Sequence, residues 1–371
     1  MIYRLKRISI WNKLHIDVIL LFFILLLLTY SILIGWSASG QNIKIIENKI
    51  IQIIIGLIVM VITAQITPRS YEISAPYLYF LCILLLALVE FFGEISKGAQ
   101  RWLNIGIIRF QPSEIAKIAV PLMIGRFIYR RNIYPPSLSD TIIVLFLILI
   151  PSLLVSIQPD LGTAALIIVS GLFVLFLSGL SWITIGITIL LVSILILLLW
   201  FFLMHDYQRD RVAVMLDPEI DPLGAGYHII QSKIAIGSGG LFGKGWLCGS
   251  QSQLEFLPER HTDFVFSVLG EEMGLVGGLV LLSLYFGIII RGLTIAIQAK
   301  NAFSRIIVSS WMLVFFTYVF INIGMVSGLL PVVGVPLPLI SYGGSSLIVL
   351  MTEFGIIMSI STHQKILSKA I

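Results

Sequence analysis

The chain has 371 residues, of which 58% are hydrophobic and only 12% are charged, and its formal net charge is +5. A soluble fold of this size needs a charged and polar exterior, so the composition excludes a soluble protein and indicates one membrane domain over residues 1–371. The positive charge does not point to nucleic acid as a partner, because Lys and Arg gather in the short loops that orient membrane proteins.

Ten apolar stretches follow one another along the chain, and a helix needs about 20 such residues to cross a bilayer. We predict spans at 16–36, 49–66, 73–92, 112–131, 141–157, 163–180, 183–204, 264–290, 305–328 and 346–362. The first stretch is too long for the apolar part of a cleavable signal peptide. The sequence therefore predicts an all-α polytopic membrane protein of about ten transmembrane helices.

Basic residues are distributed unequally between the two sets of loops. One set includes Arg126, Arg130 and Arg131 at the end of the fourth span and also contains most of the other basic residues. The opposite short loops contain only Lys44, Lys49, Lys97, Arg101 and Arg109. By the positive-inside rule, both termini are expected in the cytoplasm.

Two segments interrupt the series of spans. Residues 205–262, between the seventh and eighth spans, form a large polar loop that we expect on the outer side. Residues 329–345 are apolar but contain Pro331, Pro336 and Pro338, which are incompatible with a regular helix. Such a backbone must lie against protein or a watery cavity, so we interpret it as a re-entrant or surface-lying segment.

Unusual polar residues gather on the outer side of this topology. They are Arg101, Glu114, Lys117, Asp160, Asp263, Ser341 and Ser345. A transporter would be expected to concentrate such groups near the midplane of the membrane. A cavity that opens outward instead suits an enzyme that meets a lipid-borne substrate at the outer surface.

Glu114 and Lys117 are three residues apart, so they share one face of the fourth span, and each would be costly alone in a membrane. We expect them to pair, either as a structural ion pair or as part of a substrate cavity.

Asp263 begins the eighth span, where partial desolvation would make it a better general base. The alternative for Asp263 is a helix N-cap, a role that Thr262 could also fill.

The glycine-rich run at 237–245 resembles a phosphate loop but fails the nucleotide pattern, because Lys244 is followed by Gly245. No nucleotide cofactor is expected. The run is either a flexible loop or a close backbone approach to a pyrophosphate. The five histidines have no metal-type spacing.

Four blocks of sequence resemble the SEDS family (shape, elongation, division and sporulation). They are 98–117 (GAQRWL through QPSEIAK), 158–163 (QPDLGT), 231–264 (QSKIAIGSGGLFGKG with PERHTDF) and 322–346 (NIGM through PLISYGGSS). The short tails are more similar to the RodA branch of the family than to the FtsW branch. The resemblance covers essentially the whole chain.

The resemblance implies a ten-span peptidoglycan glycosyltransferase of the bacterial inner membrane, which polymerises lipid II during cell elongation. It implies that Asp263 is the essential acid, and that Glu114 and Lys117 belong to the central cavity. The substrate-binding candidates are Arg101, Asp160, Arg209, Arg211, Lys233, His261, Ser341 and Ser345. Asp263 is expected to act on the outer face, either as a general base or as a ligand of a divalent cation such as Mg²⁺ or Mn²⁺.

Two other classes of function stay open, a lipid II flippase and a non-catalytic scaffold of the elongation machinery.

The resemblance also implies a class B penicillin-binding protein as partner, together with other proteins of the elongation complex. Small residues allow helices to approach closely in a bilayer, so an expected docking face lies on the eighth and ninth spans. Its small residues are Gly270, Gly274, Gly277 and Gly278 in the eighth span and Ser309, Ser310 and Gly324 in the ninth. The alternative is that these glycines pack against helices of their own chain.

Overall fold

Long apolar helices account for most of the chain. The computed structural model describes residues 14–96, 99–105, 108–132, 134–180, 182–198, 201, 209, 213–214, 217, 220–221, 224–254, 256–257 and 259–367. Among these residues, seven helices are long and apolar enough to cross a membrane. They are α2 (Val18–Ala38), α3 (Ile43–Gln65), α4 (Pro68–Phe92), α6 (Leu138–Ile157), α12 (Val265–Gln298), α13 (Ala302–Val326) and α14 (Gly344–Leu367).

Three further helices correspond to predicted spans but are shorter or more polar. They are α5 (Pro112–Arg131), α7 (Leu161–Leu177) and α8 (Trp182–Leu198). Each of the ten predicted stretches therefore coincides with a helix, although several ends differ by a few residues. The apolar patterning located these helices because length and hydrophobicity dominate the signal of a membrane helix.

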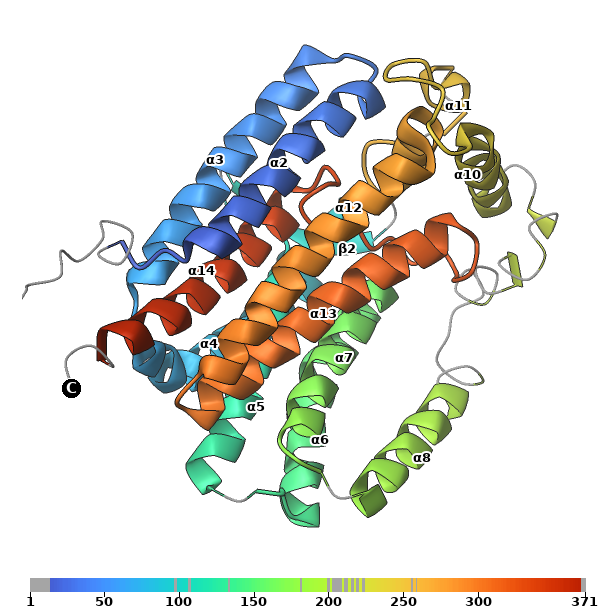
Figure 1. The fold of residues 1–371 in the computed structure, drawn as a ribbon. Helices are drawn as coiled ribbons and strands as arrows, with labels where there is room; N and C mark the ends of the chain where they lie inside the picture. Colours follow the sequence, from blue (N-terminus) through green and yellow to red (C-terminus); the bar gives the residue numbers. More distant parts are fainter. Residues whose placement is uncertain are drawn as a thin grey trace, which may run out of the picture.

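Two large apolar clusters lie within the bundle (Figure 1), and α4, α5 and α13 contribute residues to both. The larger core lies among α2, α3, α12, α13 and α14, and it includes the fully buried Trp311, Tyr285 and Phe354. The smaller core lies among α4, α5, α6 and α7. Helix α8 stands apart from both clusters in Figure 1, and Trp182 at its start is 87% exposed.

Two regions for which we predicted no regular secondary structure contain strands or helices. The strands β1 (Glu94–Ser96), β2 (Ala99–Ile105) and β3 (Ile108–Phe110) form an antiparallel sheet in the order β1-β2-β3 before α5. Helices α10 (Ala225–Gly239) and α11 (Ser250–Gln253) lie within 205–262, so the predicted connection between the seventh and eighth spans contains helical structure. Ile229, Ser232 and Ala235 are buried at intervals of three residues, and this spacing gives α10 a face for packing.

The glycine-rich run packs against the first half of α12. Gly274 interrupts α12 with a left-handed φ of 64°, and the run packs into the interruption. The amides of Lys244 and Gly245 donate to the carbonyl oxygens of Glu271 and Glu272, each at 3.0 Å. These donors are already used, so the run is a structural support for α12.

The small residues of α12 serve contacts within the chain. A Cβ on Gly270 would meet Ile236 of α10 at 3.2 Å, and one on Gly277 would meet the Tyr30 hydroxyl of α2 at 3.2 Å. The Tyr30 hydroxyl also donates to the Gly277 carbonyl at 3.1 Å. Gly270 and Gly277 therefore allow α10 and α2 to pack closely on α12, as the alternative interpretation expected, while a docking face for a partner at the other small residues stays a prediction.

Candidate active site

Asp263 lies just before the start of α12, within the turn formed by residues 259–264. The N-cap residue of α12 is Phe264, which has no capping side-chain hydrogen bond, so Asp263 precedes the cap and the N-cap interpretation was wrong. Its side chain is half-buried. This position places the carboxylate at the edge of the apolar bundle.

The backbone around Asp263 is held by three side-chain or backbone contacts. The Asn322 amide of α13 donates to the carbonyl oxygens of Asp263 at 3.0 Å and Val335 at 2.8 Å. The Ser341 hydroxyl donates to the Thr262 carbonyl at 2.6 Å. The Tyr342 amide donates to the His261 carbonyl at 2.9 Å. Asp263 is thus joined to α13 and to the proline-rich segment 329–345.

The proline-rich segment forms a wall beside the carboxylate. A Cβ built on Gly334 would lie 3.7 Å from the Asp263 Oδ2 atom. The segment is anchored in the protein interior, because the Tyr285 hydroxyl donates to the Pro338 carbonyl at 2.7 Å and Lys49 Nζ donates to the Ile340 carbonyl at 2.7 Å. Side chains of α12 and α3 therefore supply hydrogen bonds to a backbone that has no helical partners.

Glu114 and Lys117 form a buried ion pair on α5, with 2.6 Å between Glu114 Oε2 and Lys117 Nζ. Lys117 Nζ also lies 5.1 Å from the centre of the Tyr318 ring on α13. Tyr318 precedes Asn322 by four residues, so the two share a face of α13 one helical turn apart. The expected pair is present, and α13 connects it to the backbone of Asp263.

A second carboxylate reaches the same region from α14. Glu353 is buried and interacts electrostatically with both Lys117 and Glu114. Glu353 is an acid within the last predicted span, and the sequence alone favours a packing or interface role for it over chemistry. A single acid within an apolar span was a sufficient signal for a partner, because such a group is costly in the membrane unless it is paired.

Arg101 and Asp160 stabilise the turn between α6 and α7. The Arg101 guanidinium donates to the Gln158 carbonyl at 3.1 Å and also to the Pro159 carbonyl. Asp160 caps α7 by accepting from the Thr163 amide at 3.2 Å, and it accepts from Gln111 at 2.8 Å. A Cβ on Gly162 would lie 2.6 Å from the Val333 carbonyl, so this turn packs against the proline-rich segment.

The remaining candidates are spread more widely. Lys233 is exposed, and its side chain lies over Gly328 just beyond α13. The His261 ring lies 6.2 Å from the Tyr342 ring, and Ser345 is half-buried in the first turn of α14. Arg209 donates to the Phe201 carbonyl at 3.3 Å. Arg211 lies outside the described residues.

His228 of α10 lies near Asp263, and no metal-type spacing in the sequence singled it out. Its ring lies 5.8 Å from that of Phe264, the next residue after Asp263. Burial lowers the pKa of His228, and the opposing effect of Glu259 and Asp221 is smaller. Burial therefore favours the neutral form of this imidazole.

Metal ligation was one of the two expected roles of Asp263. Within the described parts of the chain, no three or more His, Cys, Asp or Glu side chains converge in a way that could hold a metal ion. These residues do not form a protein-only metal site of the usual kind. We therefore derive no step through a resident cation.

The chain is similar to characterised proteins over nearly its whole length. The model of the FtsW, RodA and SpoVE family, described as "Cell cycle protein", matches residues 12–366. The chain is 66% identical over 363 residues to the peptidoglycan glycosyltransferase MrdB of Escherichia coli strain K12, covering 98% of each chain. It is 30% identical over 426 residues to the peptidoglycan glycosyltransferase RodA of Treponema pallidum, covering 94% of this chain and 98% of the relative.

Solved structures show the same architecture. One is described as "Structural coordination of polymerization and crosslinking by a peptidoglycan synthase complex"; its matching chain has a TM-score of 0.81 and 33% identity, with coverage of 93% of this chain and 97% of that chain. The crystal structure of RodA from Thermus thermophilus has a TM-score of 0.71 and 27% identity, covering 93% and 96%. By the extent of the family match and the identity to MrdB, this chain belongs to the FtsW, RodA and SpoVE family and is of the RodA type.

Proposed function

We propose that this chain is a peptidoglycan glycosyltransferase that polymerises lipid II into glycan strands during cell elongation. The observation that carries the proposal is the chain of contacts from the buried Glu114–Lys117 pair through Tyr318 and Asn322 to Asp263. It connects the backbone of the half-buried Asp263 at the bundle edge, through α13, to a fixed pair of charges within the bundle. The 66% identity to MrdB supports the same activity.

In the proposed reaction, Asp263 takes the proton from the acceptor sugar hydroxyl. The hydroxyl oxygen then attacks the anomeric carbon of the lipid-linked donor, and the bond from that carbon to the pyrophosphate breaks with inversion. The electron pair of the broken bond leaves with undecaprenyl pyrophosphate. Lys233, which is exposed and has no hydrogen bond within the described residues, is a cation available to stabilise this leaving group.

The proposed membrane arrangement has ten spans. Helices α5, α7 and α8, added to the seven long apolar helices, would give that number. The polar residues of α5 are compatible with a span because they face α13 and α14 inside the bundle. Both termini would lie in the cytoplasm and Asp263 at the outer face of the bacterial inner membrane.

The proposed partners are lipid II, a class B penicillin-binding protein and other proteins of the elongation machinery. A glycan polymerase alone makes strands without cross-links. The similarity to a chain of a structure described as a complex that coordinates polymerization and crosslinking supports a transpeptidase partner.

The test is polymerisation of fluorescent lipid II by the purified full-length chain, with and without its partner. We expect glycan ladders from the wild type, and for Asp263→Asn a loss of at least about 100-fold, the usual lower range for a general base. Glu47→Gln is the matched control, because Glu47 is exposed on α3. Ladders at the wild-type rate from Asp263→Asn would remove Asp263 from the reaction. Absence of product from the wild type with an active partner would favour a flippase or a scaffold.

A further inference from the structure

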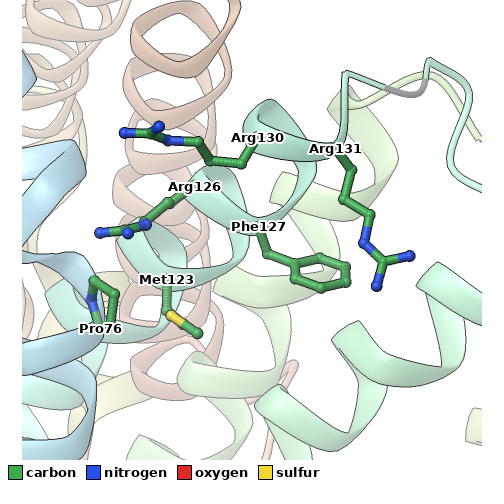
Figure 2. A pocket seen from close by; sticks show the side chains of 6 residues that line it. All are labelled: Pro76, Met123, Arg126, Phe127, Arg130 and Arg131. Atoms are coloured by element: carbon green, nitrogen blue, oxygen red, sulfur yellow. The ribbon is translucent and has the colours of Figure 1, made fainter.

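A cavity lies at the end of α5 remote from Asp263. Its volume is about 380 Å³, and it is lined by Pro76, Met123, Arg126, Phe127, Arg130 and Arg131. Figure 2 shows Arg126 and Arg130 extending toward α4, with Arg131 on the other side of Phe127. The volume falls within the range of about 300–1,000 Å³ that is typical of ligand sites.

Arg126 is held in place by a local feature of α4. Pro76 has no amide hydrogen, so the Glu72 carbonyl one turn earlier lacks its helical donor. Arg126 Nη1 replaces that donor, with contacts of 2.9 Å to the Glu72 carbonyl and 2.6 Å to the Ile73 carbonyl. Its Nε and Nη2 groups make no hydrogen bond within the described residues, and among these residues it has no carboxylate partner.

The other two arginines are paired but keep spare donors. Arg130 Nε lies 2.6 Å from Glu72 Oε1, and Arg131 Nη1 lies 2.8 Å from Asp140 Oδ1. Their side chains are 57% and 49% exposed. A guanidinium has five N–H donors, so each can still bind an anion. Three arginines against two carboxylates leave the cavity with an excess of one positive charge.

The rest of the cavity is apolar. Pro76, Met123 and Phe127 provide it with hydrocarbon surface, while the arginines provide its charge. Helix α5 has 20 residues and is about 30 Å long, so its last turn lies near a membrane surface whichever face that is. A ligand that matches both parts has an anionic phosphate joined to hydrocarbon.

We propose that this cavity binds the phosphate of an anionic phospholipid, with Arg126 and Arg130 contacting the phosphate and Met123 and Phe127 contacting the start of the acyl region. Arginine suits this role because its planar fork matches phosphate oxygens. The apolar surface favours a lipid over a free phosphate ion. This site is separate from the proposed glycosyltransferase chemistry and stands if that chemistry is disproved.

The test measures lipid retention by the detergent-purified full chain, using native mass spectrometry during titration with phosphatidylglycerol or phosphatidylcholine. We expect preferential binding of phosphatidylglycerol, and about tenfold weaker binding by Arg126→Gln, the effect of losing one charge-assisted contact. The Gln amide can still donate toward the Glu72 carbonyl, which favours folding of this variant. Lys300→Gln is the matched control, because it removes one exposed positive charge at the same end of the molecule.

A second variant guards against a general loss of stability. The pair Glu72→Gln with Arg130→Gln removes one guanidinium without changing the net charge of the cavity, and it should also weaken phosphatidylglycerol binding. Equal binding of the two lipids by the wild type, or wild-type binding by both variants, would overturn the proposal. If inorganic phosphate at the same concentration as the lipid displaced phosphatidylglycerol, the proposal would also be overturned, because the cavity would then be a site for a soluble anion.

Discussion

Lys117 is the only cation that interacts electrostatically with both Glu114 and Glu353 among the described residues. All three side chains are buried, and Tyr318 lies beside them. A buried charge is tolerated only when partners compensate for lost hydration. The stability of this region of the bundle therefore depends on the lysine more than on either acid.

Lys117→Met should destabilise the protein by about 3–5 kcal/mol, because it leaves two buried carboxyl groups without their cation. Adding Glu353→Gln should recover part of that loss by removing one of the two acids. The unfolding temperature of each variant in detergent, monitored by size-exclusion chromatography, measures both changes. If Lys117→Met unfolded at the wild-type temperature, the pair would not be a structural requirement.

Asp17 connects the start of α2 to two distant helices. It caps α2 through the Leu20 amide, contacts Arg291 of α12 at 2.6 Å and accepts from Ser361 of α14 at 2.8 Å. Burial raises the pKa of Asp17, but hydrogen bonds from Arg291 and Ser361 outweigh it, and the pKa is held well below its usual range. The carboxylate therefore stabilises the folded state when it is ionised.

This lowered pKa gives Asp17 a definite pH dependence. Its stabilising effect is present above the unfolded pKa of about 3.9, and it is lost as the pH falls toward the lower pKa of the folded state. Asp17→Asn should be less stable than the wild type at pH 7, with a difference that shrinks below about pH 4. Unfolding temperatures across pH 3–8 measure this, with the exposed Glu90→Gln as control. A difference that is constant with pH would contradict the assigned role.

At the scale of elements, Lys49 of α3 holds the proline-rich segment against α2. Its ammonium donates to the Ile340 carbonyl at 2.7 Å and to the Ser31 carbonyl at 2.9 Å. Gly35 of α2 makes room for it, because a Cβ there would lie 2.9 Å from Lys49 Nζ. The segment that Lys49 anchors also lies beside Asp263, so we expect Lys49 to help position this segment relative to the carboxylate.

Lys49→Met should leave the fold nearly unchanged. The Ile340 carbonyl keeps a hydrogen bond from the Ser31 hydroxyl at 3.1 Å, and loss of the buried cation offsets the loss of its contacts. Polymerisation should nevertheless fall by about tenfold to 100-fold, because small displacements at a reacting centre are costly. Activity and unfolding temperature are measured together, with Lys44→Met, an exposed residue on α3, as control. Unchanged activity would show that the segment needs no anchor there.

The elements differ in how far the sequence could predict them. The apolar helices were predictable from length and hydrophobicity, and α5 was located at 112–131, as observed. Helix α10 was missed because its short apolar face is diluted by polar residues, and β1 and β3 have only three residues each. Lys49 was assigned to a loop because the predicted span began there, whereas α3 begins at Ile43. Its burial depends on Gly35 and Ile340, which no local pattern connects to it.

At the scale of the whole molecule, the two ends of the bundle differ in chemistry. One end contains Asp263, the proline-rich segment and the turn held by Arg101 and Asp160. The other contains Arg126, Arg130 and Arg131. The positive-inside rule assigns the arginine-rich end to the cytoplasm, and this assignment would place Asp263 where a lipid-linked sugar is exposed outside the cell.

The two cysteines provide a direct test of this orientation. Cys248 is exposed and follows the glycine-rich run, which packs on the first half of α12, whereas Cys82 is buried within α4. Figure 1 shows α10 and α11, which flank Cys248 in sequence, at the same end as the start of α12. An exposed thiol there should be reachable only from the side of the membrane that holds Asp263.

A membrane-impermeant maleimide applied to intact spheroplasts should therefore label the wild-type chain at Cys248. The Cys248→Ser variant should stay unlabelled both before and after permeabilisation, because the remaining thiol of Cys82 is 1% exposed. Denaturation should then make Cys82 reactive, which shows that the reagent and the protein were competent. If the wild type were labelled only after permeabilisation, Cys248 and Asp263 would lie on the cytoplasmic side, and a lipid-linked substrate at the outer surface could not reach the carboxylate.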